Sequence, residues 1–525
     1  MQILRGLDRN ASRGCAGQRE LRVVTRLSQH ATPSQLISTG LPVKLDAQVG
    51  LFEGMCLADI AHVIVCAERS VMPPAAAAQL LSALLALRDV APASVSDLPL
   101  RSLHAIRESW LLDRTPAAGW LGVGRAASES TTTGYHICVR AEVLAFIDAL
   151  IEFGRAALHS AEQYRTSVMP DYAYLSEGQP TTFGHYLLGF VMALLRDIAR
   201  AEAFFHRVNR SPAGIGASNG CSLGLDRNRL ALLLGFEGPV GHARDAMWQV
   251  DGPIEALAIA CSCAVHLDRL AEDLMRFCTA DFGIVALLDR HLAAGRTMPQ
   301  MNSDSALAFV RSTTNRLIGM QAAMTTAGRT PCGQMDNHIR PDGDVPRAFV
   351  MAGQLARLMG DVVMHLRFDE SHGIAAVRRA CVYTGDLAEA VMLKSGLDFG
   401  KAYSIAERLV RARAVVREVG AQDAFAADGL PTIPTGAELD AMARATVGQS
   451  IGLSDSEMQA AIDPQTAVER RAGIGGTAAQ PFAAMVHECD EELSNAAAKR
   501  GEIERSMARS RQALITMAQE LVERT

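Results

Sequence analysis

The sequence predicts a mainly α-helical protein built around a central bundle of long helices. Apolar residues in the segment 139–165 recur at the spacing of one helix face, at Val143, Phe146, Ile147, Leu150 and Ile151. No segment shows a convincing alternation of apolar and polar residues, so no sheet is expected. Aromatic residues make up only 5% of the chain, which also favours helix over strand.

Three further segments are predicted to be long helices. Residues 180–208 open with proline and threonine, which suit a helix start, and then run apolar for several turns. Residues 305–326 form another candidate. Residues 252–278 are apolar on most sides, so we expect neighbouring helices, including those of other subunits, to bury this segment.

Composition narrows the functional class. The chain has 525 residues, enough for roughly two to four domains, and a net charge of −6 that gives no reason to expect nucleic acid or an anionic membrane as a partner. The longest apolar run, near 256–266, is too short to span a bilayer. Eleven cysteines lack paired spacing, which is typical of reduced thiols in a cytoplasmic protein and does not indicate zinc. Six arginines but no apolar run occur in residues 1–45, so no secretory signal is expected.

Polar, glycine-rich segments are expected to connect the helices. They comprise residues 122–134, 169–180 and 211–227, and the polar stretch that begins at residue 294. None matches a phosphate-binding pattern. Each alone reads as an ordinary connector, but four in one helical chain suggest that some of them meet at a functional site.

Five separated motifs resemble successive landmarks of one enzyme family. In chain order they are VMPDYAYLSEGQPTTFGHYLL, RVNRSPAGIGASNGCSLGLDR, HLDRLAEDL, MPQMNSDSAL and IDPQTAVERRAGIGGTA. The sequence is similar here to argininosuccinate lyase, of the fumarase/aspartase superfamily. The resemblance spans residues 50–480 and implies a three-domain helical subunit, a homotetramer, and active sites where loops of three subunits meet. The family eliminates fumarate from argininosuccinate, breaking a C–N bond without a cofactor.

On this basis the chain is divided into five parts. Residues 1–45 are an N-terminal extension, 46–135 an N-terminal helical domain and 136–370 the central bundle that carries the tetramer core. Residues 371–480 form a C-terminal helical domain. An intermittent apolar stripe among charges in 481–525 predicts one or two amphipathic helices, packed on the body or on a partner subunit. A solvated helical tail is the alternative.

Most chemical positions of the family are substituted in this chain. The family loop has the form G-S-S-x-M-P-x-K-x-N, in which the second serine is the proposed base, and that position here is Arg296. The family lysine falls at Met301 or Asn302, and its asparagine at Ser303. In the first of the five motifs, Tyr174 occupies the position of the family histidine. The ancestral fold explains why a polar loop is kept here, although its original chemical groups are missing.

The candidate catalytic residues are therefore Tyr174 and Arg296. An arginine can clamp a carboxylate through two donors, although one on a loop is as often simply solvated. A tyrosine can donate a proton, although packing of its ring into a vacated pocket is at least as common. The candidate substrate-binding residues are Arg125, Ser128, Ser176, Gln179, Thr297, Asn302 and Ser303. Histidines on helical patterns (His62, His104 and His266), and His185 at a family frame position, are expected to be structural.

Two classes of function fit these observations. The first is an argininosuccinate lyase-like C–N lyase that acts on a non-standard amino-acid or dicarboxylate-type substrate in a specialised pathway, with no cofactor or metal. The second is an inactive homologue with a structural or binding role, or one that forms mixed tetramers with an active paralogue. Fold alone does not decide between them.

Overall fold

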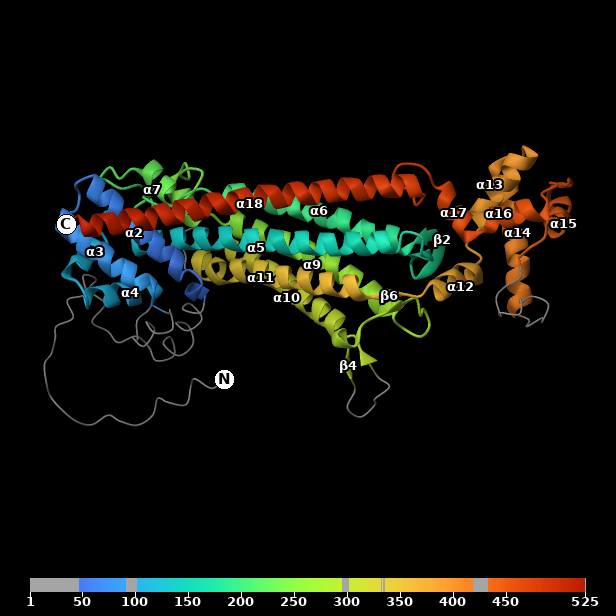
Figure 1. The fold of residues 1–525 in the computed structure, drawn as a ribbon, viewed down its shortest axis with the longest axis horizontal. Helices are drawn as coiled ribbons and strands as arrows, with labels where there is room; N and C mark the ends of the chain where they lie inside the picture. Colours follow the sequence, from blue (N-terminus) through green and yellow to red (C-terminus); the bar gives the residue numbers. More distant parts are fainter. Residues whose placement is uncertain are drawn as a thin grey trace.

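The computed structural model describes residues 47–90, 102–294, 302–331, 333, 336–418 and 433–524. In these ranges the protein is an elongated bundle of helices with a helical unit at each end (Figure 1). This confirms the predicted fold class. Within the described residues no helix is both long and apolar enough to cross a membrane.

Six long helices form the bundle. They are α5 (Ala127–Gln163), α6 (Phe183–Val208), α9 (Asp251–Phe277), α10 (Ser305–Gly328), α11 (Asp336–His365) and α18 (Ala479–Glu523). Their apolar faces share one continuous core. The predicted helices at 180–208, 252–278 and 305–326 are confirmed, with ends that shift by a few residues. The helix predicted at 139–165 starts earlier, at Ala127.

Short helices gather at the end of the bundle where α5 begins. They are α2 (Phe52–Glu68), α3 (Pro74–Arg88), α4 (Leu103–Leu112), the 3₁₀ helix η3 (Pro116–Trp120), α7 (Arg227–Leu233) and α8 (Ala243–Trp248). Helix α2 packs directly on α5. Gly54 and Gly134 face each other there, and a Cβ on Gly54 would lie 2.7 Å from the carbonyl oxygen of Gly134. The two glycines therefore let the helix backbones approach closely.

The opposite end carries a second helical unit. It contains α12 (Glu370–Ala380), α13 (Thr384–Ser395), α14 (Phe399–Glu418), α15 (Gly436–Val447), α16 (Asp455–Ile462) and α17 (Pro464–Arg470). Buried residues between Tyr383 and Ile462 form a hydrophobic cluster separate from the main core. The domain boundaries stay predictions, and the one between residues 135 and 136 falls inside α5.

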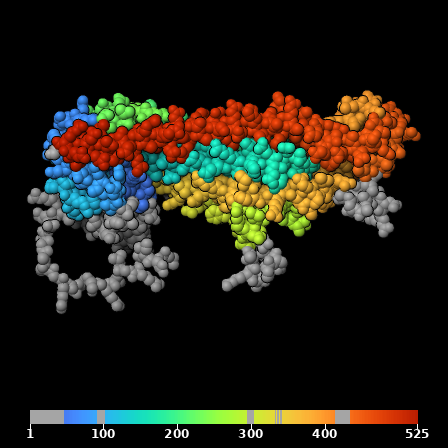
Figure 2. All heavy atoms as spheres, viewed as in Figure 1, coloured from blue at the N-terminus to red at the C-terminus, as the bar shows by residue number. Residues whose placement is uncertain are grey.

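The C-terminal segment forms one helix. Helix α18 has 45 residues, returns along the bundle and packs on α2, α3, α5, α6 and α7. Figure 2 shows it as the red ridge that runs along most of the molecule. Leu493, Leu514 and Ile515 on its inner side are buried. The structure therefore has the predicted packing on the body of the same chain, and α18 is not a solvated tail.

Three two-stranded antiparallel sheets occur in the described residues. Strand β1 (Val168–Ala173) pairs with β2 (Ser176–Thr182), β3 (Val285–Ala286) with β6 (Arg367–Phe368), and β4 (Ala293–Ala294) with β5 (Asn302–Ser303). The expectation that residues 169–180 form a plain connector is wrong, because most of them form the β1–β2 hairpin. The sequence hid it because prolines and a glycine interrupt the alternation.

The expectation that residues 122–134 form a loop is also wrong, because residues from Ala127 onward are the first turns of α5. Tertiary burial stabilises helix in this polar run despite its weak helix propensity. The hydroxyl groups find partners inside the helix or across it: Thr131 donates to the carbonyl of Ala127, and Thr133 to that of Glu129. The threonines are thus part of the helix and do not cap it.

Candidate functional site

Arg125 and Ser128 lie at the start of α5. The Arg125 guanidinium is almost completely buried and forms an ion pair with Asp59 on α2. Its Nε also donates to the carbonyl of Leu121 at 3.1 Å. Ser128, one turn along, is half-buried. The predicted role of Arg125 in binding substrate stays a prediction, but in this chain its charge already has a partner.

Asp59 is the centre of a buried polar cluster. Its carboxylate pairs with both Arg107 on α4 and Arg125, and it accepts a hydrogen bond from Ser130 Oγ at 3.0 Å. Burial alone would raise the pKa of Asp59, but the two guanidinium groups hold it well below its usual range. The carboxylate therefore stays ionised and joins α2, α4 and α5 at one point.

Two histidines line the same cluster. Burial lowers the pKa of His62 to about 3 and that of His104 to about 4, and the charge of Arg125 adds to both effects. Both side chains are therefore neutral at ordinary pH. Their assignment as structural residues stays a prediction.

Glu129 organises the loop that follows α6. Its carboxylate accepts hydrogen bonds from the backbone N–H groups of Gly214 at 3.0 Å and Gly216 at 2.5 Å. Both glycines have positive φ, +79° and +69°, which other residues adopt only with strain. Segment 211–227 is thus fixed beside the start of α5. That these connectors share a site stays a prediction. Burial raises the pKa of Glu129.

Tyr174, Ser176 and Gln179 lie on the β1–β2 hairpin. Tyr174 and Leu175 form its tip with φ of +53° and +64°, a turn geometry that favours asparagine and glycine. Tyr174 is fully exposed, and Ser176 and Gln179 are exposed on β2. The alternative that the tyrosine ring packs into a vacated pocket does not occur within this subunit.

The remaining predicted site residues either form β5 or lie between β4 and β5 in the sequence. Arg296 and Thr297 lie outside the described residues. Asn302 and Ser303 make up β5, whose backbone pairs with Ala294 and Ala293 of β4. The two strands lie at the edge of the bundle (Figure 1).

One subunit does not bring these groups together. The 37 residues of α5 separate Ser128 from the hairpin, a span of about 55 Å at the usual helix rise. Figure 1 shows the hairpin at one end of the bundle, the start of α5 at the other, and β4 between them. A site that uses all three groups must therefore combine more than one copy of the chain.

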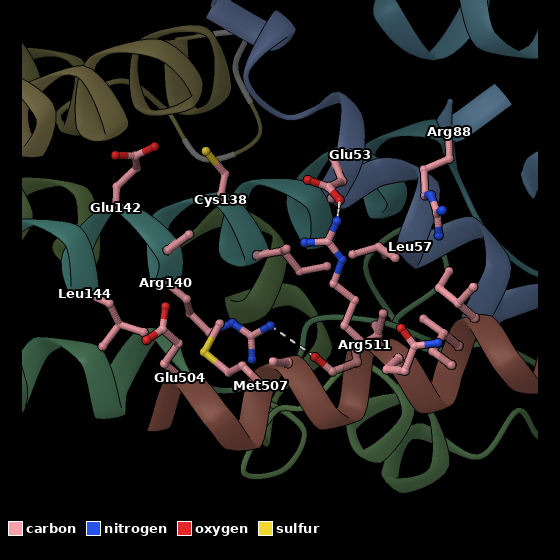
Figure 3. Close-up of a pocket in the computed structure, with 18 of the residues that line it drawn as sticks. Glu53, Leu57, Arg88, Cys138, Arg140, Glu142, Leu144, Glu504, Met507 and Arg511 are labelled. Carbon is pink, nitrogen blue, oxygen red and sulfur yellow. Dashed lines mark hydrogen bonds and ion pairs between the residues drawn. The ribbon is translucent and has the colours of Figure 1, made fainter. Parts of the chain in front are cut away.

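A large groove lies elsewhere. It has a volume of about 1010 Å³ and is formed by α2, α5 and α18 (Figure 3). Arg511 of α18 crosses it to pair with Glu53 of α2. None of the predicted site residues that the structure describes lines it. No set of three or more His, Cys, Asp or Glu side chains in the described ranges is arranged to hold a metal ion.

Sequence reasoning missed Asp59 and Glu129. Asp59 stands in the run MCLADIAHVIVC, where a carboxylate among apolar residues signals a buried ion pair. Glu129 was hidden because its surroundings were read as a loop.

A family model described as lyase matches residues 105–319. Together with the helical bundle, this match places the chain in a class of lyases. Curated relatives narrow the class. Argininosuccinate lyase of Methanoculleus marisnigri is 30% identical over 451 residues, 85% of this chain and 88% of the relative, and that of Geobacillus thermodenitrificans is 27% identical over 83% of this chain and 91% of the relative. The chain belongs to the argininosuccinate lyase family.

A solved structure shows the same fold. The crystal structure of EDDS lyase in complex with formate superposes with a TM-score of 0.80 at 22% identity, and the match covers 94% of this chain and 97% of that one.

Proposed function

We propose that this protein is a C–N lyase that eliminates a dicarboxylate such as fumarate from an N-substituted amino acid other than argininosuccinate, or runs the reverse addition. The observation that carries the proposal is the combination of an intact family fold with altered chemical positions. Its relatives, named argininosuccinate lyase, supply the reaction class, and Arg296 and Tyr174 stand where the family motif has its serine base and its histidine.

The chemistry sets what the site must provide. The proton to be removed lies on a carbon next to a carboxylate, so the carbanion-like state needs positive charge and hydrogen-bond donors at the carboxylate oxygens. A base must act on that proton, and an acid must reach the leaving nitrogen. We assign carboxylate binding to Arg296 and proton transfer or shielding to Tyr174. Arg125, Ser128, Ser176, Gln179, Thr297, Asn302 and Ser303 are the proposed substrate-binding residues.

We infer that the working unit is a homotetramer with no cofactor. The separation of Ser128 from the hairpin along α5 supports a site shared between copies. Exposed apolar side chains on α10 (Phe309 and Ile318) and on α11 (Val350 and Met364) supply surface for such contacts. Helix α9 offers less surface for contacts between subunits than its sequence suggested, because α6, α10 and α11 of the same chain already cover most of it.

A cytoplasmic location and a specialised amino-acid pathway belong to the same proposal. The alternative is a catalytically inactive homologue that binds ligands or assembles with an active paralogue, and the substituted chemical positions favour it. An adjacent gene for an intact relative would point to that partner role, and a biosynthetic gene cluster to the enzyme.

The deciding experiment measures fumarate. The purified chain is incubated with a panel of N-substituted aspartates, and with fumarate plus a panel of amines, and ultraviolet absorbance is followed. Turnover of any member that is lost in Arg296→Ala supports the lyase. No turnover in either direction, with an active paralogue restoring it in mixed tetramers, supports the partner role.

A further inference from the structure

His291 is a buried histidine that precedes segment 295–301 by four residues. His291 ends the 3₁₀ helix η4 (Asp289–His291), two residues before β4, and its side chain is only 3% exposed. Its Nε2 lies 2.7 Å from Oδ2 of Asp361 on α11. Because a carboxylate accepts and does not donate, the N–H is on Nε2. One hydrogen bond thus joins the chain ahead of β4 to the bundle.

The same residue also contacts the chain that follows β5. Ser305 Oγ, in the first turn of α10, donates to the backbone carbonyl of His291 at 3.1 Å. Strands β4 and β5 pair between these two contacts. His291 is therefore the point where both flanks of segment 295–301 and helix α11 meet.

Charged neighbours reinforce the contact. Arg290 Nη2 lies 2.6 Å from Oδ1 of Asp361 and 2.9 Å from Nδ1 of His365. Although partial burial alone would raise it, the pKa of Asp361 is lowered by the hydrogen bond from His291 and the charge of Arg290. The carboxylate is thus ionised at neutral pH, and its hydrogen bonds are charge-assisted and strong.

Packing alone does not explain a histidine here. Among the described residues, Nδ1 of His291 has no hydrogen-bond partner, although it is buried. A buried polar atom without a partner is costly, and an apolar side chain here would avoid that cost. The contact that compensates is the directional one to Asp361.

We propose that His291 is a positioning residue that, through Asp361, fixes strands β4 and β5 relative to α11. The inference rests on the proposed function only for its consequence, which is that the segment between the strands carries reactive groups. The anchoring itself is a property of the free protein. It can therefore be tested without substrate.

The test compares three variants by hydrogen exchange of the β4 and β5 backbone amides in the full chain. His291→Leu keeps the volume but removes the donor, His291→Gln keeps an N–H at the position of Nε2, and Asp361→Asn removes the charge. We expect exchange to accelerate about tenfold or more in His291→Leu and Asp361→Asn, because local opening replaces an anchored state. His291→Gln should restore most of the protection.

A matched control is His372→Gln. His372 also pairs with an aspartate, Asp369, at 3.0 Å, but it is exposed on α12. It should leave exchange in β4 and β5 unchanged. Equal exchange in His291→Leu and the native chain overturns the proposal, and so does equal acceleration in the leucine and glutamine variants. If His291→Leu does not fold, the comparison of exchange in Asp361→Asn and in His372→Gln tests the proposal instead. Once a substrate is known, the leucine variant should lower kcat more than it raises KM, and the glutamine variant should restore kcat.

Discussion

Asp59 and Arg125, 66 positions apart in the chain, form a buried ion pair that ties α2 to the start of α5. Arg107 shares the same carboxylate from α4. A single carboxylate thus fixes the N-terminal helices against the bundle, and its two arginines would be left without their shared counter-charge if it were removed.

Asp59→Asn should destabilise the protein by about 3–5 kcal/mol, because removing one member of a buried ion pair leaves uncompensated charge. Chemical unfolding followed by circular dichroism measures this. The matched control is Glu68→Gln, which breaks the more exposed pair with Arg229. That change should cost no more than about 1 kcal/mol. Equal losses of unfolding free energy in the two variants would show that the buried Asp59 ion pairs stabilise the protein no more than an exposed pair does.

Mild acidification should destabilise the fold through its buried histidines. Burial lowers the pKa of His136 to about 4, alongside His62 at about 3 and His104 at about 4. The unfolded chain takes up protons near the ordinary histidine pKa of about 6.5, whereas the folded chain does not. Stability from these groups is therefore full above about pH 6.5 and lost as the pH falls toward 4.

The expected slope is about 1.4 kcal/mol per pH unit for each histidine in that window. Unfolding free energies measured at a series of pH values give it. In His136→Gln the slope should be smaller by the contribution of one histidine, about 1.4 kcal/mol per pH unit. A stability that does not change between pH 6.5 and 4.5 would contradict the burial of these side chains in neutral form.

Helix periodicity made the bundle predictable. The apolar stripes of α6, α9 and α10 are local in sequence, so their spacing shows them directly. The start of α5 could not be read this way, because its hydroxyl residues are helical only through tertiary contacts such as that of Ser130 with Asp59. The β1–β2 hairpin was missed because its prolines hide the alternation.

The candidate site was predictable only as separate pieces. Motif order placed Ser128, Tyr174 and Arg296 in three segments, but nothing local in sequence gives the distance that α5 sets between the first two. The role of Asp59 also depends on partners 48 and 66 positions away, which no short motif contains.

The protein should assemble through the uncovered side of α10. Phe309 is 55% and Ile318 47% exposed, a large apolar surface for a free chain. Light scattering should give the mass of four chains, and Phe309→Glu or Ile318→Glu should lower it. The control is Leu393→Glu on α13, which also replaces an exposed apolar side chain and should leave the mass unchanged. A stable monomer at micromolar concentration would remove the basis for a shared site.

Argininosuccinate itself should not be cleaved at a useful rate. The family's serine base, lysine and histidine are all replaced, and loss of a general acid or base typically costs a hundredfold or more, without additivity between residues of one unit. Fumarate release from argininosuccinate, followed beside an intact relative as control, measures this. Comparable turnover in the two proteins would show that the motif positions were assigned wrongly.

The last prediction separates the two candidate catalytic residues. Arg296→Ala should abolish binding of a dicarboxylate while leaving the melting temperature nearly unchanged, since its guanidinium is proposed to clamp the carboxylate and a residue of a polar loop, as the sequence predicts here, carries little stability. Tyr174→Phe should keep binding and lose turnover, because it removes only the phenolic hydroxyl from a fully exposed tip. Calorimetric titration with fumarate, paired with the turnover assay, distinguishes the two effects.

Leu175→Ala, at the neighbouring tip position, is the control for the turn itself. A loss of turnover there equal to that of Tyr174→Phe would assign the effect to hairpin shape. If Arg296→Ala leaves both binding and turnover intact, the carboxylate must be held by another cation. If the native chain itself shows no turnover, the inactive-homologue alternative is favoured instead.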